Sequence, residues 1–154
     1  KRVCHCDTKV NNMLFTEDGS EVLCVIDLDT VMPSYIFSDY GDFLRTAANT
    51  VAEDEPDFGK IQFRMDIFEA FTEGYLSSAR SFLTPLEIEM LPFAVKLFPY
   101  MQSVRFLWDY LNGDVYWKVK YPTHNLVRAQ NQFHLLQRIE EREEDLKAFI
   151  ASKL

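Results

Sequence analysis

The pattern of apolar and polar positions divides the chain into a short strand-forming part and a long helical remainder. Residues 12–15 and 21–27 read as short strands, and the turn-forming residues Glu17-Asp18-Gly19-Ser20 between them predict a β-hairpin. An irregular stretch around Pro33 follows, and from residue 38 onward apolar residues recur at helical spacing. The pattern therefore predicts an α+β fold that is mainly α-helical.

Capping and helix-breaking residues predict where the helices begin and end. A first helix is expected over 38–50 with Ser38 or Asp39 as its N-cap, and a second along the apolar stripe from 63 to 76. Thr84-Pro85-Leu86-Glu87 combines an N-cap, a proline at the first helical position and a capping box. Pro92 and Pro99 are expected to end, kink or restart the helix from 86 to 111.

One last helix is expected over 123–151, after Asn112-Gly113 has closed the preceding one. Its predicted inward positions are Leu126, Phe133, Leu136, Ile139, Leu146 and Ile150, and the charge run over 138–145 is expected to be solvated. The chain shows no internal repeat and no interdomain linker. We therefore expect residues 1–154 to form a single domain.

Composition and charge narrow the class of protein. With 154 residues, 47% of them hydrophobic, the chain can bury a sizeable core. The net charge of −8 argues against a nucleic-acid partner, which would require clustered Lys and Arg. No stretch of about 18 apolar residues is present, so no membrane span is expected. We expect a cytoplasmic protein.

The cysteines fit the same compartment. Their number, three, is odd, so Cys4, Cys6 and Cys24 do not form a disulfide framework. Cys4-His5-Cys6 invites a zinc interpretation, but a tetrahedral site needs a second pair of ligands, and the remaining histidines lie far away in sequence. Small buried thiols in an extended segment are the favoured interpretation.

The chemistry-bearing residues cluster near the N-terminus. His5, Asp7, Lys9 and Asn12 have the spacing His-x-Asp-x-Lys-x-x-Asn, and Asp27 ends the second strand of the predicted hairpin. Phosphoryl transfer from a nucleotide requires a carboxylate that deprotonates the acceptor hydroxyl, oxygen ligands for Mg²⁺, and positive charge near the transferred group. The alternative is that these are ordinary loop caps and turn residues, but their order and separation favour a phosphoryl-transfer loop.

Each of these residues has a candidate role. Asp7 is the predicted base, while Asn12 and Asp27 supply oxygen ligands for Mg²⁺. Lys9 is placed to reach the γ-phosphate as it gains charge. His5 is expected to brace the loop by hydrogen bonding, because Asp7 already fills the role of the base. The hairpin would hold both aspartates near one end of a small sheet.

The chain resembles the C-terminal lobe of the aminoglycoside-phosphotransferase-like kinases, which have a protein-kinase-like fold. Within them it is most similar to the bacterial N-acetylhexosamine 1-kinases, whose relatives are sometimes labelled mucin-desulfation proteins. The segments that carry the resemblance are 5–12, 25–33, Asp39-Tyr40-Gly41-Asp42, 68–72, Arg105-Phe106-Leu107 and 109–116. No cysteine lies in a motif for conversion to formylglycine, so sulfatase chemistry is not expected.

The resemblance implies phosphorylation, with ATP and Mg²⁺, of the anomeric hydroxyl of N-acetylglucosamine or N-acetylgalactosamine. It also implies that Asp29 is a further carboxylate of the metal site and that Asp42, at a helix start, braces the catalytic loop as structural support. Arg105 and Tyr116 are the implied sugar contacts. Their alternatives stay open: Arg105 as the partner of Asp109 one helical turn on, and Tyr116 as a core residue.

The resemblance also implies that an N-terminal lobe is absent from this chain. A Gly-rich loop, a strand lysine for the α- and β-phosphates and its partner glutamate do not occur in the sequence. We therefore expect the chain alone to be inactive and to expose an apolar docking surface that can drive homodimerisation. The alternatives are a non-catalytic sugar-binding or interaction module, and a kinase for an aminoglycoside, choline or homoserine.

Overall fold

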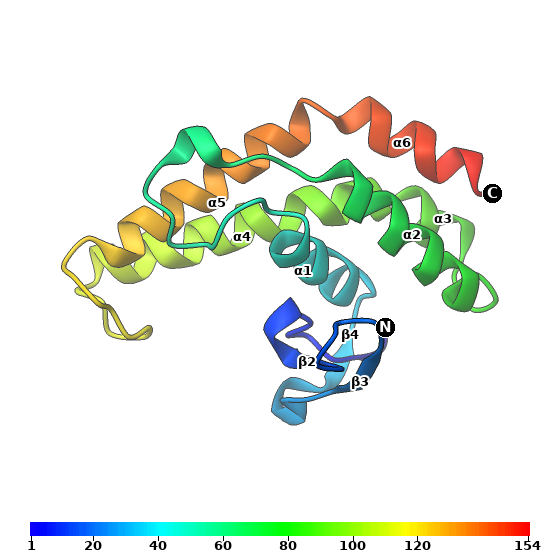
Figure 1. Cartoon of the computed structure of the whole chain (residues 1–154), viewed down its shortest axis with the longest axis horizontal. Coiled ribbons are helices and arrows are strands. Elements are labelled where there is room, and N and C mark those ends of the chain that lie inside the picture. Colours follow the sequence, from blue (N-terminus) through cyan, green and yellow to red (C-terminus); the bar gives the residue numbers. More distant parts are fainter.

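Two small antiparallel sheets precede an assembly of helices in the computed structural model, which describes residues 1–154 (Figure 1). The strands are β1 (Arg2–Cys4), β2 (Met13–Phe15), β3 (Val22–Val25) and β4 (Met32–Ser34). The helices are α1 (Phe37–Ala47), α2 (Met65–Ala79), α3 (Pro85–Glu89), α4 (Leu91–Leu111), α5 (His124–Glu140) and α6 (Glu143–Ser152). The expected α+β fold with a mainly helical character is confirmed.

The predicted hairpin is confirmed as the pair β2–β3, with Met13 opposite Val25. No sequence pattern predicts the other sheet, in which β1 pairs with β4 and Cys4 lies opposite Met32. Its strands are three residues long, and Pro33 has no N–H to donate, which is tolerated because β4 is an edge strand. This pairing ties the start of the chain to the segment leading into α1.

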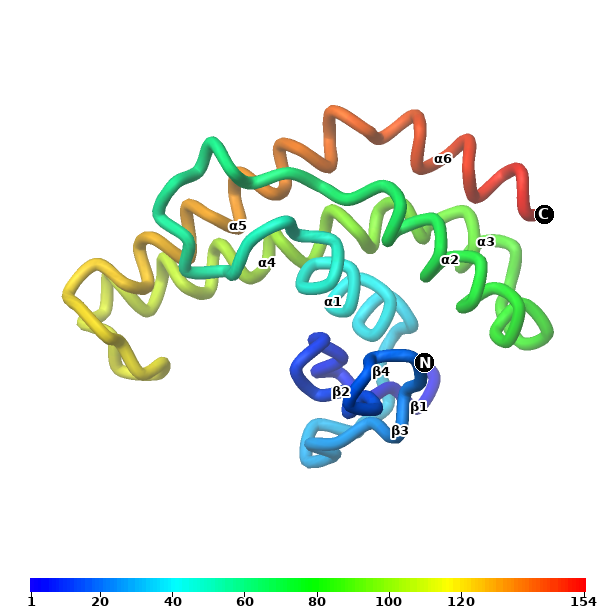
Figure 2. Tube along the Cα trace, in the orientation of Figure 1, coloured from blue at the N-terminus to red at the C-terminus, as the bar shows by residue number.

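Helices α4 and α5 run side by side in opposite directions and form the long axis of the molecule (Figures 1 and 2). Helix α1 packs across α4, and the sheets lie beyond α1, on the side away from α5. The core between the helices is apolar and includes fully buried Tyr40, Leu44, Phe68, Leu91 and Leu135. The N-terminal sheets are therefore attached to the helical body chiefly through α1.

The start of α1 differs from the expectation. The helix begins at Phe37, so Ser38 and Asp39 lie within its first turn, and neither caps the helix with its side chain. The Asp39 carboxylate instead accepts hydrogen bonds from the segment before β2. Two residues further on, Gly41 faces α4 so closely that an added Cβ would lie 2.5 Å from the Ala94 carbonyl oxygen.

The capping box at Thr84 is confirmed: its side chain accepts the Glu87 N–H, and the Glu87 carboxylate accepts the Thr84 N–H. The chain restarts as α4 at Leu91, with Pro92 in the first turn, while α4 continues through Pro99. It closes before Gly113, whose φ of 87° is readily adopted by glycine.

The prediction of one helix over 123–151 is wrong. The helix breaks between Glu140 and Glu143, giving α5 and α6. Phe133 is 51% exposed and does not point inward, whereas its neighbours Asn131 and Gln132 are buried. The inward face of α5 is therefore partly polar, because it receives the acidic loop over 52–57 as well as apolar neighbours.

The remaining sequence expectations concern membranes and cysteines. No helix is long and apolar enough to span a bilayer. The cysteines are all free, and no group of three or more His, Cys, Asp or Glu side chains is arranged to hold a metal ion. Cys4 is buried, and burial, with a further contribution from Asp39, raises the pKa of its thiol to about 11.

Candidate active site

The loop before β2 is held by Asp39 at the start of α1. The Asp39 carboxylate accepts hydrogen bonds from the backbone N–H groups of His5, at 3.0 Å, and Cys6, at 2.8 Å. The Thr8 hydroxyl donates to the Asp39 carbonyl oxygen at 2.6 Å. Cys6 has a φ of 67°, which is uncommon for a residue with a side chain. Asp39 thus fixes a loop conformation that the backbone alone would not favour.

Asp7 projects from this loop with one oxygen occupied and the other free. Lys9 Nζ, at 2.7 Å, and Asn12 Nδ2, at 2.8 Å, both donate to Asp7 Oδ2. Asn12 Nδ2 also donates to the Asp7 carbonyl oxygen at 2.8 Å. Asp7 Oδ1 accepts no hydrogen bond from the protein, so its lone pairs can accept a proton from a bound hydroxyl.

His5 links this loop to the end of β3. Its Nδ1 accepts the Asp7 N–H at 3.3 Å, so the ring proton lies on Nε2, which donates to the Ile26 carbonyl oxygen at 2.9 Å. The Ile26 N–H donates in turn to the Asn12 carbonyl oxygen at 2.9 Å. These contacts place Asp27, the next residue, beside the Asn12 end of the loop.

The predicted metal ligands lie on this side of the site. Both donors of the Asn12 amide are used on Asp7, which leaves Asn12 Oδ1 without a protein donor. Asp27 is exposed and adopts a left-handed conformation with a φ of 65°, and exposed Asp29 follows in a 3₁₀ turn. One amide oxygen with one or two carboxylates suits Mg²⁺, which keeps several waters and takes its other ligands from substrate phosphates.

A cleft of about 770 Å³ opens beside the loop over residues 5–12, the candidate catalytic loop. Asp7 and Lys9 belong to its lining, and so do Arg105 and Tyr116, which lie a hundred residues away in sequence. Its lining further includes Arg45, Asn49, Glu53, Asp54, Gln102, Phe106, Trp117, Arg128 and Gln132. The structure therefore brings together the predicted base and the predicted sugar contacts, while Asn12, Asp27 and Asp29 lie outside this lining.

Both alternative interpretations of Arg105 and Tyr116 are wrong. Arg105 donates to Gln102 Oε1 at 3.1 Å and lies over the Trp117 ring at 5.1 Å, with no ion pair to Asp109. Tyr116 is 67% exposed and packs edge-on against Trp117, with the ring centres 4.5 Å apart. Both side chains are thus available to a molecule in the cleft.

Asp109 instead holds the loop that carries Tyr116 and Trp117. Its buried carboxylate accepts their backbone N–H groups at 2.8 and 3.0 Å and Asn125 Nδ2 at 2.9 Å. Burial acts to raise the pKa of Asp109, but the N–H groups of Trp117, Tyr116 and Val115 outweigh it and lower the pKa. The loop is therefore anchored by a buried carboxylate.

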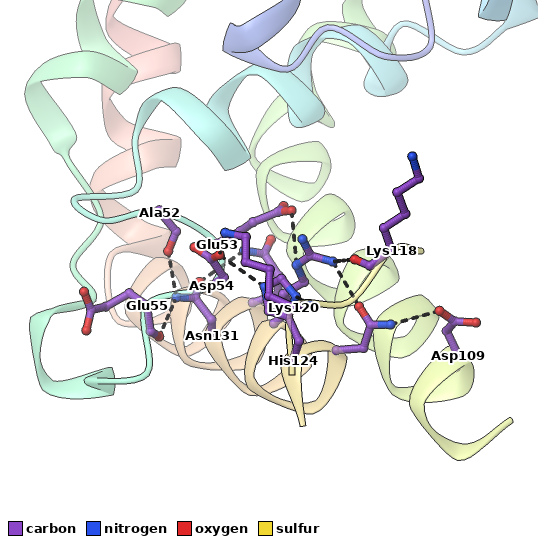
Figure 3. Close-up of polar contacts among 12 residues, drawn as sticks. Ala52, Glu53, Asp54, Glu55, Asp109, Lys118, Lys120, His124 and Asn131 are labelled. Carbon is purple, nitrogen blue, oxygen red and sulfur yellow. Dashed lines mark hydrogen bonds and ion pairs between the residues drawn. The ribbon is translucent and has the colours of Figure 1, made fainter. Parts of the chain in front are cut away.

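The acidic loop over 52–57 forms another wall and is fastened to α5 (Figure 3). Asn131 Nδ2 donates to the carbonyl oxygens of Ala52, at 3.1 Å, and Glu55, at 3.3 Å. His124 Nδ1 accepts the Lys120 N–H, so its Nε2 donates to Asp54 Oδ2 at 3.1 Å. Hydrogen bonds from Lys120 Nζ and then His124 lower the pKa of Asp54.

Arg45 forms the buried centre of the cleft floor. It donates to Asp42 Oδ1 at 2.9 Å and, through Nη1, to Glu53 Oε2 at 3.1 Å and Gln132 Oε1 at 3.4 Å. Burial raises the pKa of Asp42, although the Arg45 charge opposes this. Asp42 thus lies below the site in an ion pair, and a backbone hydrogen bond from Lys9 also acts to lower its pKa, while Asp39 binds His5, Cys6 and Thr8.

Comparison with known families fits this geometry. A sequence model described as APH, the phosphotransferase enzyme family, matches residues 1–79, just over half of the chain. The chain belongs to the phosphotransferase enzyme family. The matched segment contains the catalytic loop, both sheets, α1 and α2, which is the part that positions Asp7. The wall of this phosphotransferase cleft that carries Arg105 and Tyr116 lies outside the matched segment.

Sequence reasoning missed several residues of this phosphotransferase site. Asp39 was considered only as a helix cap, although its place in Asp39-Tyr40-Gly41-Asp42 was a signal. Trp117 directly follows a predicted contact and could have been found from that position. Glu53 and Arg128 gave no local signal, because the acidic loop and the charged face of α5 resemble ordinary solvated surface.

Proposed function

We propose that this chain is the base-bearing and acceptor-binding lobe of a kinase that phosphorylates the anomeric hydroxyl of an N-acetylhexosamine. The observation that carries the proposal is the shared cleft, which is lined by Asp7 together with Arg105 and Tyr116. The resemblance of the late motif to hexosamine 1-kinases supports the choice of acceptor. The family membership supports phosphoryl transfer in general.

The residues divide the work as follows in this proposal. Asp7 Oδ1 accepts the proton of the attacking hydroxyl, while Lys9 and Asn12 hold the other oxygen in place. Asn12 Oδ1 and Asp27 hold Mg²⁺, with Asp29 as a further carboxylate. The metal, when bound with ATP, neutralises charge on the phosphates. His5 holds Asp7 and the end of β3 in their relative positions through its two ring nitrogens.

The charge balance of the cleft supports an uncharged acceptor. Four cationic side chains line it, Lys9, Arg45, Arg105 and Arg128, against the three carboxylates Asp7, Glu53 and Asp54. Because Lys9 is paired with Asp7, and Arg45 with Asp42 and Glu53, these charges nearly cancel, and such a lining suits a neutral polyol better than a polycationic aminoglycoside. The aromatic faces of Tyr116 and Trp117 suit the apolar face of a sugar ring.

A neighbouring apolar hollow supports an acceptor with an acetamido group. It measures about 320 Å³ and shares Arg105, Tyr116 and Trp117 with the main cleft, adding Val104 and Trp108. A polar cleft that continues into an apolar hollow matches a sugar whose hydroxyls and N-acetyl methyl point to different sides.

The proposal also requires a lobe that holds the nucleotide. The hairpin exposes apolar side chains along both strands, among them Leu14, Phe15, Val22, Leu23 and Val25. An exposed apolar patch of this kind is typical of a surface that another part of a protein covers. We propose that a nucleotide-binding lobe docks here, next to the metal ligands.

Sugar binding tests the choice of acceptor with this chain alone. In isothermal titration calorimetry we expect binding of N-acetylglucosamine or N-acetylgalactosamine, and weaker binding of kanamycin and choline. Arg105→Ala should weaken sugar binding at least tenfold, whereas Arg138→Ala, on the exposed face of α5, should leave it unchanged. Preference for kanamycin or choline, or no effect of Arg105→Ala, would contradict the proposed acceptor.

Phosphoryl transfer tests the chemistry in the protein that also carries the nucleotide lobe. Phosphorus NMR should show a sugar 1-phosphate, and Asp7→Asn should lower kcat by about 10²–10⁴ while sugar affinity stays within threefold. If the chain is a non-catalytic binding module, the wild type and Asp7→Asn should both bind the sugar, and neither should transfer phosphate.

A further inference from the structure

A carboxylate on the acidic loop, that of Glu53, lines the cleft but belongs to a different segment from Asp7. We propose that Glu53 binds a ring hydroxyl of the acceptor remote from the reacting one, and so selects among polyhydroxylated acceptors. The inference rests on the proposed function, because it takes the cleft to be the acceptor site. It concerns a residue outside the catalytic loop and outside the late motif that carries Arg105 and Tyr116.

Glu53 is held from behind by the buried Arg45, and the half-buried Arg128 lies beside it. Its Oε2 accepts Arg45 Nη1 at 3.1 Å, and its Oε1 lies 3.9 Å from Arg128 Nε, beyond hydrogen-bonding distance. Arg45 is itself fixed by Asp42, and Arg128 lies over the Phe106 ring and donates to Asn125 Oδ1. The position of the carboxylate is therefore set by side chains that are themselves anchored.

The exposed fractions of Glu53, Arg45 and Arg128 show which of these side chains is open to a ligand. The side chain of Glu53 is 37% exposed, against 5% for Arg45 and 15% for Arg128. The Arg128 Nε atom is buried and has no hydrogen-bond partner. The carboxylate is thus the part of the cluster that is open to the cleft.

The loop that carries Glu53 is fixed on both sides of it. Ala52 and Glu55 bind Asn131 through their carbonyl oxygens, and Asp54 binds His124, which is fully buried (Figure 3). A carboxylate on a loop with such anchors keeps its direction, as a residue that discriminates between ligands must.

The chemistry favours a hydroxyl donor as the partner of Glu53. Its Oε1 makes no hydrogen bond within the protein, and an ionised carboxylate oxygen forms strong, charge-assisted hydrogen bonds with hydroxyl groups. An acceptor lacking that hydroxyl would leave the carboxylate desolvated and without a partner in the cleft, which is the strongest basis for rejecting a ligand. Glu53 therefore selects for acceptors that carry this hydroxyl group.

The test combines variants of Glu53 with sugars that each lack one hydroxyl. Dissociation constants would be measured by calorimetry for N-acetylglucosamine and its 3-, 4- and 6-deoxy analogues. In the wild-type chain one analogue should bind about tenfold more weakly than the parent sugar. The parent sugar should bind to Glu53→Gln about tenfold more weakly than to the wild-type chain. The affinity of the same deoxy analogue should change little between the two proteins. Glu53→Asp, which keeps the charge, serves as a second variant.

Glu55→Gln is the matched control, because Glu55 lies on the same loop but outside the cleft lining, with its carboxylate on the Asp57 N–H. It should behave as wild type with every sugar. A purely structural role for Glu53 would lower the thermal midpoint and weaken all sugars by the same factor. Equal responses of wild type and both Glu53 variants across the analogues would overturn the inference.

The outcomes separate this inference from the proposed acceptor. Binding of glucose or myo-inositol in place of N-acetylhexosamine, with a Glu53-dependent loss for one deoxy analogue, would overturn the acceptor and support the role of Glu53. Formation of a sugar 1-phosphate, with no Glu53-dependent difference among the deoxy analogues, would support the proposed acceptor and overturn the role of Glu53. If none of these polyols binds the wild-type chain, both proposals fail.

Discussion

Asp39 illustrates how one carboxylate organises the catalytic loop from outside it. Its two oxygens accept the N–H groups of His5 and Cys6, and its carbonyl oxygen accepts the Thr8 hydroxyl. Asp7 itself is positioned by Lys9 and Asn12. The direction of the candidate base therefore depends on a residue of α1 that does not line the cleft.

Removing the Asp39 carboxylate should loosen this loop. We expect Asp39→Ala to lower the free energy of unfolding by about 1–3 kcal/mol, because the N–H groups of His5 and Cys6 lose a charged acceptor. Amide hydrogen exchange at these two residues should accelerate at least tenfold. Ser38→Ala, which removes only a hydroxyl contact with Ser34, is the control. Unchanged exchange at His5 and Cys6 would show that the loop is held elsewhere.

Glu87 makes a second residue-scale prediction, which depends on pH. The Arg2 guanidinium first, and then the Thr84 N–H, lower the pKa of Glu87 to about 2. Because the folded pKa lies below the unfolded one, the stabilisation is present above about pH 4.5 and is lost as the pH falls toward 2. Glu87→Gln should therefore cost about 1 kcal/mol at pH 7, after allowance for solvent screening, and almost nothing near pH 2.

Urea denaturation at several pH values measures this difference. Glu89→Gln is the matched control, since Glu89 is exposed on the same helix and makes no ion pair. A constant difference between Glu87→Gln and wild type at all pH values would contradict the assignment of the low pKa to Glu87.

At the scale of elements, the contact between α1 and α4 sets where the catalytic loop lies. Gly41 lets the two helices approach, since an added Cβ would meet the Ala94 carbonyl oxygen at 2.5 Å and Phe98 Cδ2 at 2.6 Å. The loop, the sheets and Asp39 all follow the position of α1, whereas Arg105 belongs to α4. The distance across the cleft is therefore set partly by a residue that has no side chain.

Adding one methyl group at this contact should separate the helices. We expect Gly41→Ala to lower the free energy of unfolding by about 1–3 kcal/mol, because the obstructing Ala94 oxygen belongs to the backbone and cannot rotate away. Gly74→Ala in α2 is the matched control, with no atom within 4 Å of the added Cβ. It should be neutral or stabilise by about 0.5–1 kcal/mol through helix propensity. Equal effects of the two substitutions would contradict this account.

At the scale of the whole molecule, the exposed apolar surface of the hairpin is the feature that the helical body does not use. Helices α1, α2, α4 and α5 bury their apolar faces against one another, while every residue of β3 is exposed. This difference is the physical basis for proposing that another lobe covers the hairpin.

An uncovered hairpin should make the isolated chain associate with itself. Light scattering after size-exclusion chromatography should show a molecular mass that rises with concentration, because association hides exposed apolar surface. Leu23→Glu should return the chain to a monomer, while Leu86→Glu, which changes an equally exposed leucine away from the hairpin, should not. A monomer at every concentration would count against the docking surface.

Catalysis by the isolated chain should be negligible for the same reason. We expect no ADP release above background from ATP, Mg²⁺ and N-acetylglucosamine, because the chain offers no Gly-rich loop or strand lysine to bind the phosphates. Turnover at rates of 1–100 s⁻¹, typical of kinases, would overturn the division of the site between two lobes.

How much the sequence predicted depended on how local each signal was. The hairpin, the capping box at Thr84 and the end of α4 were confirmed, since each depends on residues a few positions apart. The sheet of β1 and β4 and the break between α5 and α6 were missed. Strand pairing across thirty residues and a break without proline or glycine have no local signature.

Spacing along the chain was sufficient to predict the α+β class and membership of the phosphotransferase family. It also placed Asp7, Lys9 and Asn12 on one loop. The shared cleft, by contrast, depends on the folded arrangement, which brings Arg105, Tyr116 and Glu53 into one lining with Asp7. That arrangement follows from the packing of α1 and α5 on α4, which joins residues a hundred positions apart through contacts that no local pattern records.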